Sequence, residues 1–170
     1  MNINVRKTIF VLINIFLLLL QVTVFSNLKI GWININFALI SVIFTAMFTD
    51  GRLFAVNGFI IGFWFDMLAY RSMGYYTLLF LCVAIAIKLF SKMINRYSFI
   101  TNILVVFATT FISEFLTYWI HFVLKGTEYN SFVLTKIIMP QVLVNTVFSV
   151  FLFWFYLWLI KVFDIKNFRR

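Results

Sequence analysis

The chain has 170 residues, of which 64% are hydrophobic and 11% are charged, and its net charge is +9. Soluble domains average about 45–50% apolar and about 25% charged residues, and a fold of this length has too little interior to bury so much apolar surface. The composition therefore excludes an ordinary soluble domain and predicts one polytopic membrane domain over residues 1–170. The basic residues lie in short clusters between apolar runs, which favours contact with membrane lipid over nucleic-acid binding.

A helix that crosses the hydrocarbon core needs about 20 mainly apolar residues, and six stretches of the sequence fit. We expect an all-α protein with spans near residues 8–25, 33–48, 53–70, 75–90, 99–124 and 137–163. The first stretch, TIFVLINIFLLLLQVTVF, follows two basic residues as in a signal peptide, but no small-x-small cleavage site follows it. We therefore expect it to remain as a span. The linkers are short and leave no extramembrane domain.

The distribution of lysine and arginine predicts the orientation of these spans. One side of the membrane collects Arg6, Lys7, Arg52, Lys88, Lys92, Arg96, Lys161, Lys166, Arg169 and Arg170. The other side collects Lys29, Arg71, Lys125 and Lys136. Because the more basic side of a membrane protein faces the cytoplasm, we expect both termini to be cytoplasmic. Six spans and two ends on one side agree with each other.

The third span carries a polar residue behind two glycines, in the stretch GFIIGFWFDMLAY. Gly58, Gly62 and Asp66 are spaced by four residues and therefore share one helix face. The glycines allow another helix to approach closely, and Asp66 is expected near the extracytoplasmic end of the span. Two interpretations stay open. The face could bind a partner, or it could pack inside the bundle with Asp66 capping a helix or pairing with Arg71.

The fifth span carries a longer polar stripe, because Thr110, Glu114, Thr117 and His121 share one helix face. No lysine or arginine lies near Glu114 in its own span. Its carboxyl group must therefore be protonated or be compensated by a group on another helix. A proton or ion relay, a ligand site and a buried packing face are the three interpretations of this stripe.

The sixth span opens with KIIMPQVLVNTVFS, in which Pro140 suits the first turn of a helix and the Asn145 amide can hydrogen-bond another helix. Catalytic groups are scarce in the sequence. There is one histidine and one cysteine, no phosphate-binding loop, and no Ser/His/acid set that a fold would plausibly assemble. We therefore expect no enzyme activity, no metal site and no cofactor.

Taken together, these features resemble the MreD family of rod shape-determining proteins. The resemblance covers nearly the whole chain and is most specific in DGRLFAVNGFIIGFWFDMLAYRSMGYYTLLF. The positions that carry it are Gly58, Gly62, Asp66, Met73, Gly74, Pro140 and Asn145. The resemblance implies structural or partner-binding roles for the glycines, the aspartate, the proline and the asparagine. It also implies a non-enzymatic, multi-pass protein of the bacterial cytoplasmic (inner) membrane.

The same resemblance implies partners and a fold. Family members bind MreC and link cytoplasmic MreB filaments to the peptidoglycan synthases, RodA with its class B penicillin-binding protein, in the cell-elongation complex. The expected fold resembles the six-helix substrate-binding subunits of energy-coupling-factor vitamin transporters. The alternative function is therefore that of the substrate-binding subunit of such a transporter. Those subunits usually present an Ala-xxx-Ala face on the first span, whereas the first span here has no alanine. A channel would rest on Glu114 and His121 alone.

Overall fold

The computed structural model describes residues 3–25, 35–49, 52–69, 74–91, 93–125 and 133–163. These residues form six α-helices and no strand, which confirms the all-α prediction. The helices are α1 (Ile3–Leu20), α2 (Phe37–Phe48), α3 (Leu53–Ala69), α4 (Tyr75–Phe90), α5 (Phe99–Lys125) and α7 (Met139–Phe163). A π-helical turn, η1 (Gln21–Phe25), extends α1, and a second, η2 (Leu134–Ile138), leads into α7.

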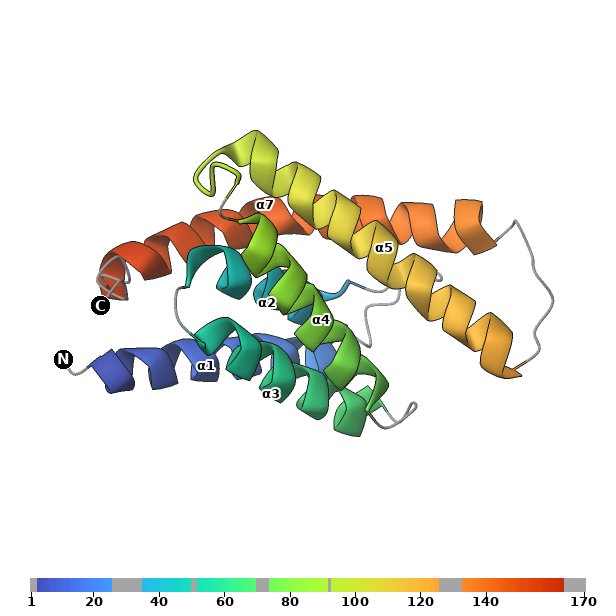
Figure 1. Ribbon diagram of the computed structural model, residues 1–170, viewed down its shortest axis with the longest axis horizontal. Helices are drawn as coiled ribbons and strands as arrows, with labels where there is room; N and C mark the ends of the chain where they lie inside the picture. Colours follow the sequence, from blue (N-terminus) through green and yellow to red (C-terminus); the bar gives the residue numbers. More distant parts are fainter. Residues whose placement is uncertain are drawn as a thin grey trace.

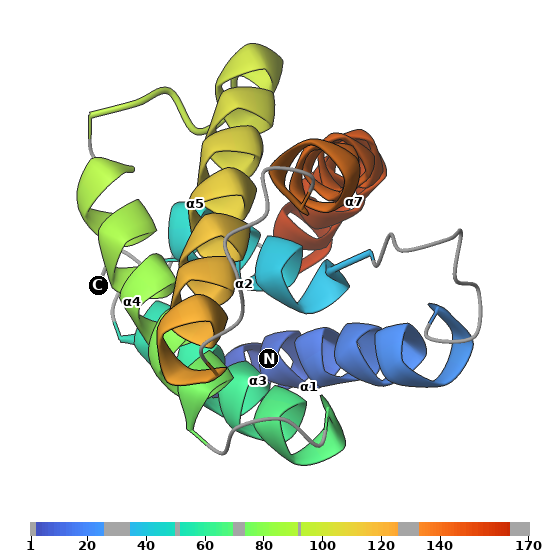
Figure 2. The same cartoon turned by 90° about the vertical axis from the view of Figure 1, so that its right-hand side faces the viewer.

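The short helix α2 is the centre of the bundle. All 12 of its residues are buried, and it contacts α1, α3, α4, α5 and α7. Its sequence, FALISVIFTAMF, carries no charge, and a helix that is apolar all round is stable only when other elements surround it. Figure 2 shows α2 between α1 and α3 on one side and α7 on the other.

Successive helices alternate in direction along the long axis of the bundle (Figure 1). In that view α1, α3 and α5 run from left to right, and α2, α4 and α7 return. The start of α1 and the end of α7 therefore lie at the same end of the molecule. The described basic residues Arg52, Lys88, Arg96 and Lys161 belong to that end, and Lys136 belongs to the opposite one.

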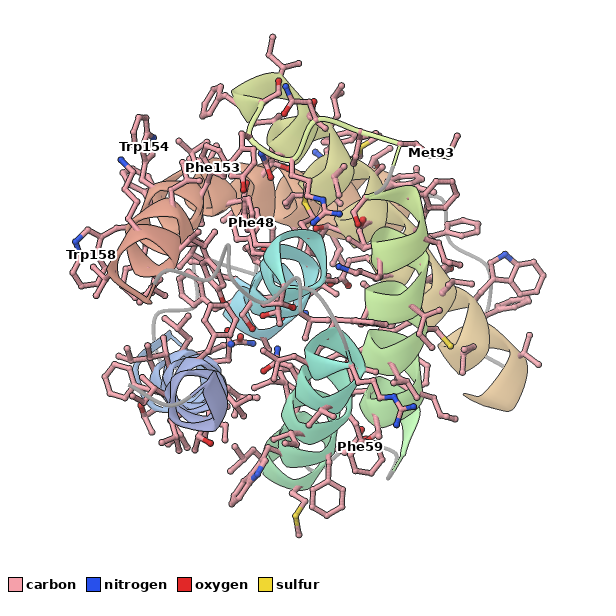
Figure 3. All side chains as sticks on the ribbon, turned by 60° about the vertical axis from the view of Figure 1, so that its left-hand side comes forward. Phe48, Phe59, Met93, Phe153, Trp154 and Trp158 are labelled. Atoms are coloured by element: carbon pink, nitrogen blue, oxygen red, sulfur yellow. The ribbon has the colours of Figure 1, made fainter. Side chains whose placement is uncertain are left out.

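The outer surface of the described bundle is rich in large apolar side chains. Figure 3 shows Trp154, Trp158 and Phe59 pointing away from the bundle, while Phe48 and Phe153 lie inside it. By length and composition, two helical stretches qualify as membrane spans, Phe99–Ile120 and Leu134–Val162. The shorter apolar helices cover Thr8–Thr23, Phe37–Phe48, Leu53–Leu68 and Tyr75–Phe90.

Polar side chains also lie in the middle of the bundle, where they connect helices. The Tyr156 hydroxyl on α7 donates a hydrogen bond to Oδ1 of Asn14 on α1, and Asn14 Nδ2 donates to the carbonyl oxygen of Phe10 at 2.9 Å. Asn57 on α3 donates from Nδ2 to Oγ1 of Thr45 on α2 at 3.2 Å. Asn14, Tyr156, Asn57 and Thr45 are all fully buried. Interhelical hydrogen bonds of this kind fix which helices pack together when lipid surrounds them.

Candidate functional site

Gly58 and Gly62 allow α3 and α4 to pack backbone against backbone. A Cβ atom added at Gly62 would lie 2.6 Å from the Cα of Thr77 and 2.7 Å from the carbonyl oxygen of Tyr76. A Cβ atom added at Gly58 would lie 3.1 Å from the carbonyl oxygen of Phe80. Both glycines are buried. The glycine face is therefore occupied by α4 of the same chain.

The carboxylate of Asp66, in the last turn of α3, caps the N-terminus of α4. Its Oδ2 accepts hydrogen bonds from the backbone N–H groups of Gly74 at 3.1 Å and Thr77 at 2.9 Å, and from the Thr77 hydroxyl at 2.6 Å. Its Oδ1 accepts from the Tyr76 N–H at 2.9 Å. The first N–H groups of a helix have no partners within it, and the helix dipole favours negative charge there. Four donors thus compensate a carboxylate that is only 5% exposed.

Gly74 precedes α4 in a conformation that only glycine adopts easily. Its φ angle is +88°, in the left-handed region where a Cβ atom causes strain. This conformation presents the Gly74 N–H to Asp66 together with the N–H groups of the first turn. Arg71, the other partner that the sequence offered for Asp66, lies outside the described residues.

The opposite end of α4 is held by a cation. Lys88, in its last turn, donates a hydrogen bond from Nζ to the carbonyl oxygen of Thr49, the residue that directly follows α2. The same Nζ lies 5.9 Å from the ring centroid of Phe54 on α3. A cation is favourable at helix C-termini because it complements the dipole and the free carbonyl groups. Asp66 and Lys88 therefore anchor the two ends of α4 to neighbouring helices.

Helices α5 and α7 are joined by a polar seam. Gln141 Nε2 donates to Glu114 Oε1 at 2.8 Å, so the neutral amide of Gln141 is one partner of this acid. The two helices run antiparallel (Figure 1). Thr110, one turn before Glu114, consequently lies level with Asn145, one turn after Gln141. Thr110 and Asn145 are both fully buried.

The seam continues into the N-terminus of α2. The backbone N–H of Asn36 donates to Asn145 Oδ1 at 2.8 Å, and Oδ1 of Asn36 accepts from the N–H of Leu39 at 3.0 Å. Oε1 of Gln21, in η1, accepts from the N–H of Ala38 at 2.8 Å. Side-chain oxygens from η1, from the residue before α2 and from α7 therefore satisfy backbone donors at this helix start.

The stripe predicted on α5 divides between two interfaces. Thr117 donates from its hydroxyl to the carbonyl oxygen of Ser113 at 2.7 Å, so the Tyr75 hydroxyl on α4 is the donor in the 2.8 Å bond between Tyr75 and Thr117. Thr117 thus contacts α4, whereas Glu114 bonds to α7. Residue 121 belongs to α5, but the side chain of His121 lies outside the described ones.

Pro140 lies in the first turn of α7, but helical backbone begins earlier than the predicted start near residue 137, because η2 precedes it. Proline has no N–H, and its ring clashes with the carbonyl group four residues before it. A π-helical turn widens the backbone at Leu134–Ile138 and so accommodates the proline within one continuous helical stretch.

Several residues that make these contacts were not among the candidate site residues predicted from the sequence. They are Gln21, Asn36, Tyr75, Thr77, Lys88 and Gln141. Gln141 had a usable signal, because it lies four residues before Asn145 and thus on the same face of α7. Thr77 also had one, because polar residues are common in the first turn of a helix.

An all-α bundle with an apolar exterior, tied together by buried polar side chains, is typical of polytopic membrane proteins. The particular family follows from the sequence, because residues 1–162 match the family model for rod shape-determining protein MreD. The chain belongs to the MreD family and has its role in rod shape determination. Comparisons with curated proteins and with solved structures give no match.

Proposed function

We propose that the chain crosses the bacterial cytoplasmic membrane six times, with both ends in the cytoplasm. The alternating directions of the six helices support this placement. The charge distribution supports it too, because the described members of the predicted cytoplasmic cluster, among them Arg52, Lys88, Arg96 and Lys161, belong to the end where α1 starts and α7 ends. The exposed apolar side chains on α1, α3, α4, α5 and α7 would then face lipid.

The function is that of a non-enzymatic scaffold of the cell-elongation complex (the elongasome). It binds MreC and supports lateral peptidoglycan synthesis together with MreB, RodA and a class B penicillin-binding protein. The observation that carries this proposal is the match to the MreD family over residues 1–162. The side-chain contacts are compatible with a scaffold, since Asp66 accepts four hydrogen bonds and Glu114 accepts one from Gln141.

The geometry restricts where MreC binds. The space beside Gly58 and Gly62 is occupied by α4, so a partner helix has to use another surface of the bundle. Lipid removes most of the hydrophobic drive between helices, and a partner's span must be held by close van der Waals contact and hydrogen bonds. Substitutions at the two glycines should therefore impair the partner complex only when they also impair folding.

The proposal is tested by depleting the protein in its native bacterium and restoring wild type or variants. Depletion should give rounded cells with mislocalised wall synthesis, and wild-type protein should restore rods and co-purify with MreC. Normal cell shape together with a new vitamin requirement would instead identify a transporter subunit. Reporter fusions at both termini test the topology separately, and a reporter active outside the cytoplasm would contradict the six-span placement.

A further inference from the structure

The two helices of the α3–α4 hairpin are much shorter than α5 and α7. If the helices cross the membrane as proposed above, this difference in length affects the surrounding lipid. α3 has 17 residues and α4 has 16, which at 1.5 Å per residue gives lengths of about 25 Å and 24 Å. α5 has 27 residues and α7 has 25, giving about 40 Å and 38 Å. The hydrocarbon core of a typical bilayer is about 30 Å thick.

Polar groups lie close to both ends of the hairpin. On α3, the exposed Arg52 and the capping carboxylate of Asp66 are separated by about 21 Å of helix. On α4, Thr77, which binds Asp66, and Lys88 are separated by about 16 Å. The exposed apolar side chains of the hairpin run from Val56 to Met67 on α3 and from Leu78 to Phe90 on α4, about 16 Å and about 18 Å along the two helices. The apolar belt of this face is therefore about 20 Å high, about 10 Å less than the core of the bilayer.

The face formed by α7 is different. Its exposed apolar side chains run from Met139 to Val162, a distance of about 35 Å along the helix. A helix of that length fits a bilayer of ordinary thickness by tilting. The hairpin cannot adapt to the bilayer by tilting, because tilting reduces the extent of a short helix along the membrane normal still further.

The charged groups near the ends of the hairpin are also held in place by hydrogen bonds and cannot shift to match a thicker bilayer. A lysine near a helix end can extend its ammonium group toward the headgroups, but Nζ of Lys88 is bound to the carbonyl oxygen of Thr49. The Asp66 carboxylate is bound to three backbone N–H groups and one hydroxyl of the first α4 turn. Neither group can follow a thicker bilayer without losing these bonds.

We propose that the α3–α4 face binds a locally thinned bilayer, while the α5–α7 face meets lipid of ordinary thickness. The partner of this surface is a lipid annulus whose hydrocarbon core is about 20 Å thick, set by the extent of the exposed apolar side chains along α3 and α4. The protein thus produces a lateral step in membrane thickness from one side of its bundle to the other.

Nitroxide depth measurements on matched pairs test this inference. The only cysteine, the exposed Cys82, is first replaced by alanine. Single labels then replace Val56 or Met67 on α3, and Leu143 or Trp154 on α7; all four side chains are exposed, and each pair is 11 residues apart. Collision rates with oxygen and with a water-soluble nickel chelate give the depth of each label in vesicles of phosphatidylcholine with 18-carbon monounsaturated chains.

The sum of the two depths in a pair is independent of how high the helix sits in the bilayer. For a pair about 16 Å apart, the sum is about 14 Å in a 30 Å core and about 4 Å in a 20 Å core. We expect the α3 sum to be about 10 Å smaller than the α7 sum. The difference should disappear with 14-carbon chains and widen with 22-carbon chains. Equal sums on the two helices at every chain length would overturn the inference.

Two further outcomes would overturn it for other reasons, and they can be told apart. If a second copy or another protein covered the hairpin, both α3 labels would be shielded from oxygen and nickel alike. If the hairpin did not lie in the membrane, both α3 labels would collide freely with the nickel chelate at every chain length. Only the second result would also contradict the six-span placement on which the inference rests.

Discussion

Asp66 and Thr77 are joined by two hydrogen bonds, because Oδ2 of the carboxylate accepts both the backbone N–H of Thr77 at 2.9 Å and its hydroxyl at 2.6 Å. One residue pair thus ties the last turn of α3 to the first turn of α4. Thr77 also provides the Cα atom closest to the hypothetical Cβ of Gly62. The glycine face and the acid are therefore two parts of the same helix contact.

Replacing Asp66 tests whether capping is its role. Asp66→Asn keeps one oxygen that can accept from the α4 N-terminus but points an NH₂ group at other donors. Asp66→Leu leaves all of the donors unsatisfied. We expect losses in the free energy of unfolding of about 1–2 kcal/mol for asparagine and about 3 kcal/mol or more for leucine. Denaturant unfolding in detergent micelles measures both, with the exposed Met67→Leu as control. Equal losses for the two variants would show that the negative charge itself is required.

The glycines should differ in their tolerance of alanine. Gly62→Ala forces a Cβ against the backbone of Thr77 and should destabilise the protein by about 1–3 kcal/mol. Gly58→Ala meets only 3.1 Å contacts, and its better helix propensity, worth about 0.8–1 kcal/mol, should make it nearly neutral. Unfolding free energies rank the two, and co-purification of MreC should follow the same ranking. Loss of MreC from a stable Gly58→Ala protein would show that the glycine face contacts the partner.

Gly74 provides a third comparison, because its surroundings are open. No atom lies within 4 Å of a Cβ added there, yet its φ angle of +88° is strained for alanine. Gly74→Ala should cost about 1–2 kcal/mol through the backbone alone. Gly74→Asn should cost less, since asparagine tolerates the left-handed region better. The same unfolding measurement decides, and a neutral Gly74→Ala would argue against a role for the backbone angle.

The sequence predicted individual helices better than their contacts. The bounds of α4 and the start of α3 agree with the prediction because glycine, arginine and serine mark them locally. The central position of α2 and the turn η2 were not predicted, since both depend on neighbouring helices. For Asp66 the sequence offered a cap or an ion pair. Choosing between them required the hairpin geometry, which brings residues 8 to 11 positions further along the chain to the carboxylate.

Lys88 should stabilise the contact between α2 and α4 through its bond to Thr49. Lys88→Met keeps most of the apolar length of the side chain but removes the ammonium group from the carbonyl oxygen. We expect a loss of about 1–3 kcal/mol in the free energy of unfolding. Lys161→Met is the matched control, because that lysine is exposed at the same end of the bundle and should change stability little. Similar losses in the free energy of unfolding for the two variants would show that Lys88 contributes only to the orientation of the protein in the membrane.

Glu114 separates a structural seam from a proton or ion relay. Glu114→Gln retains an oxygen that can accept from Nε2 of Gln141, so we expect a change of less than about 1 kcal/mol in stability and normal rod shape on complementation. Glu114→Leu leaves the Gln141 amide without this acceptor and should cost about 1–3 kcal/mol. Adding Gln141→Leu to Glu114→Leu should recover part of that loss, since both polar groups of the bond are then gone. Rounded cells from a stable Glu114→Gln protein would instead show that the ionisable carboxyl group is needed for function.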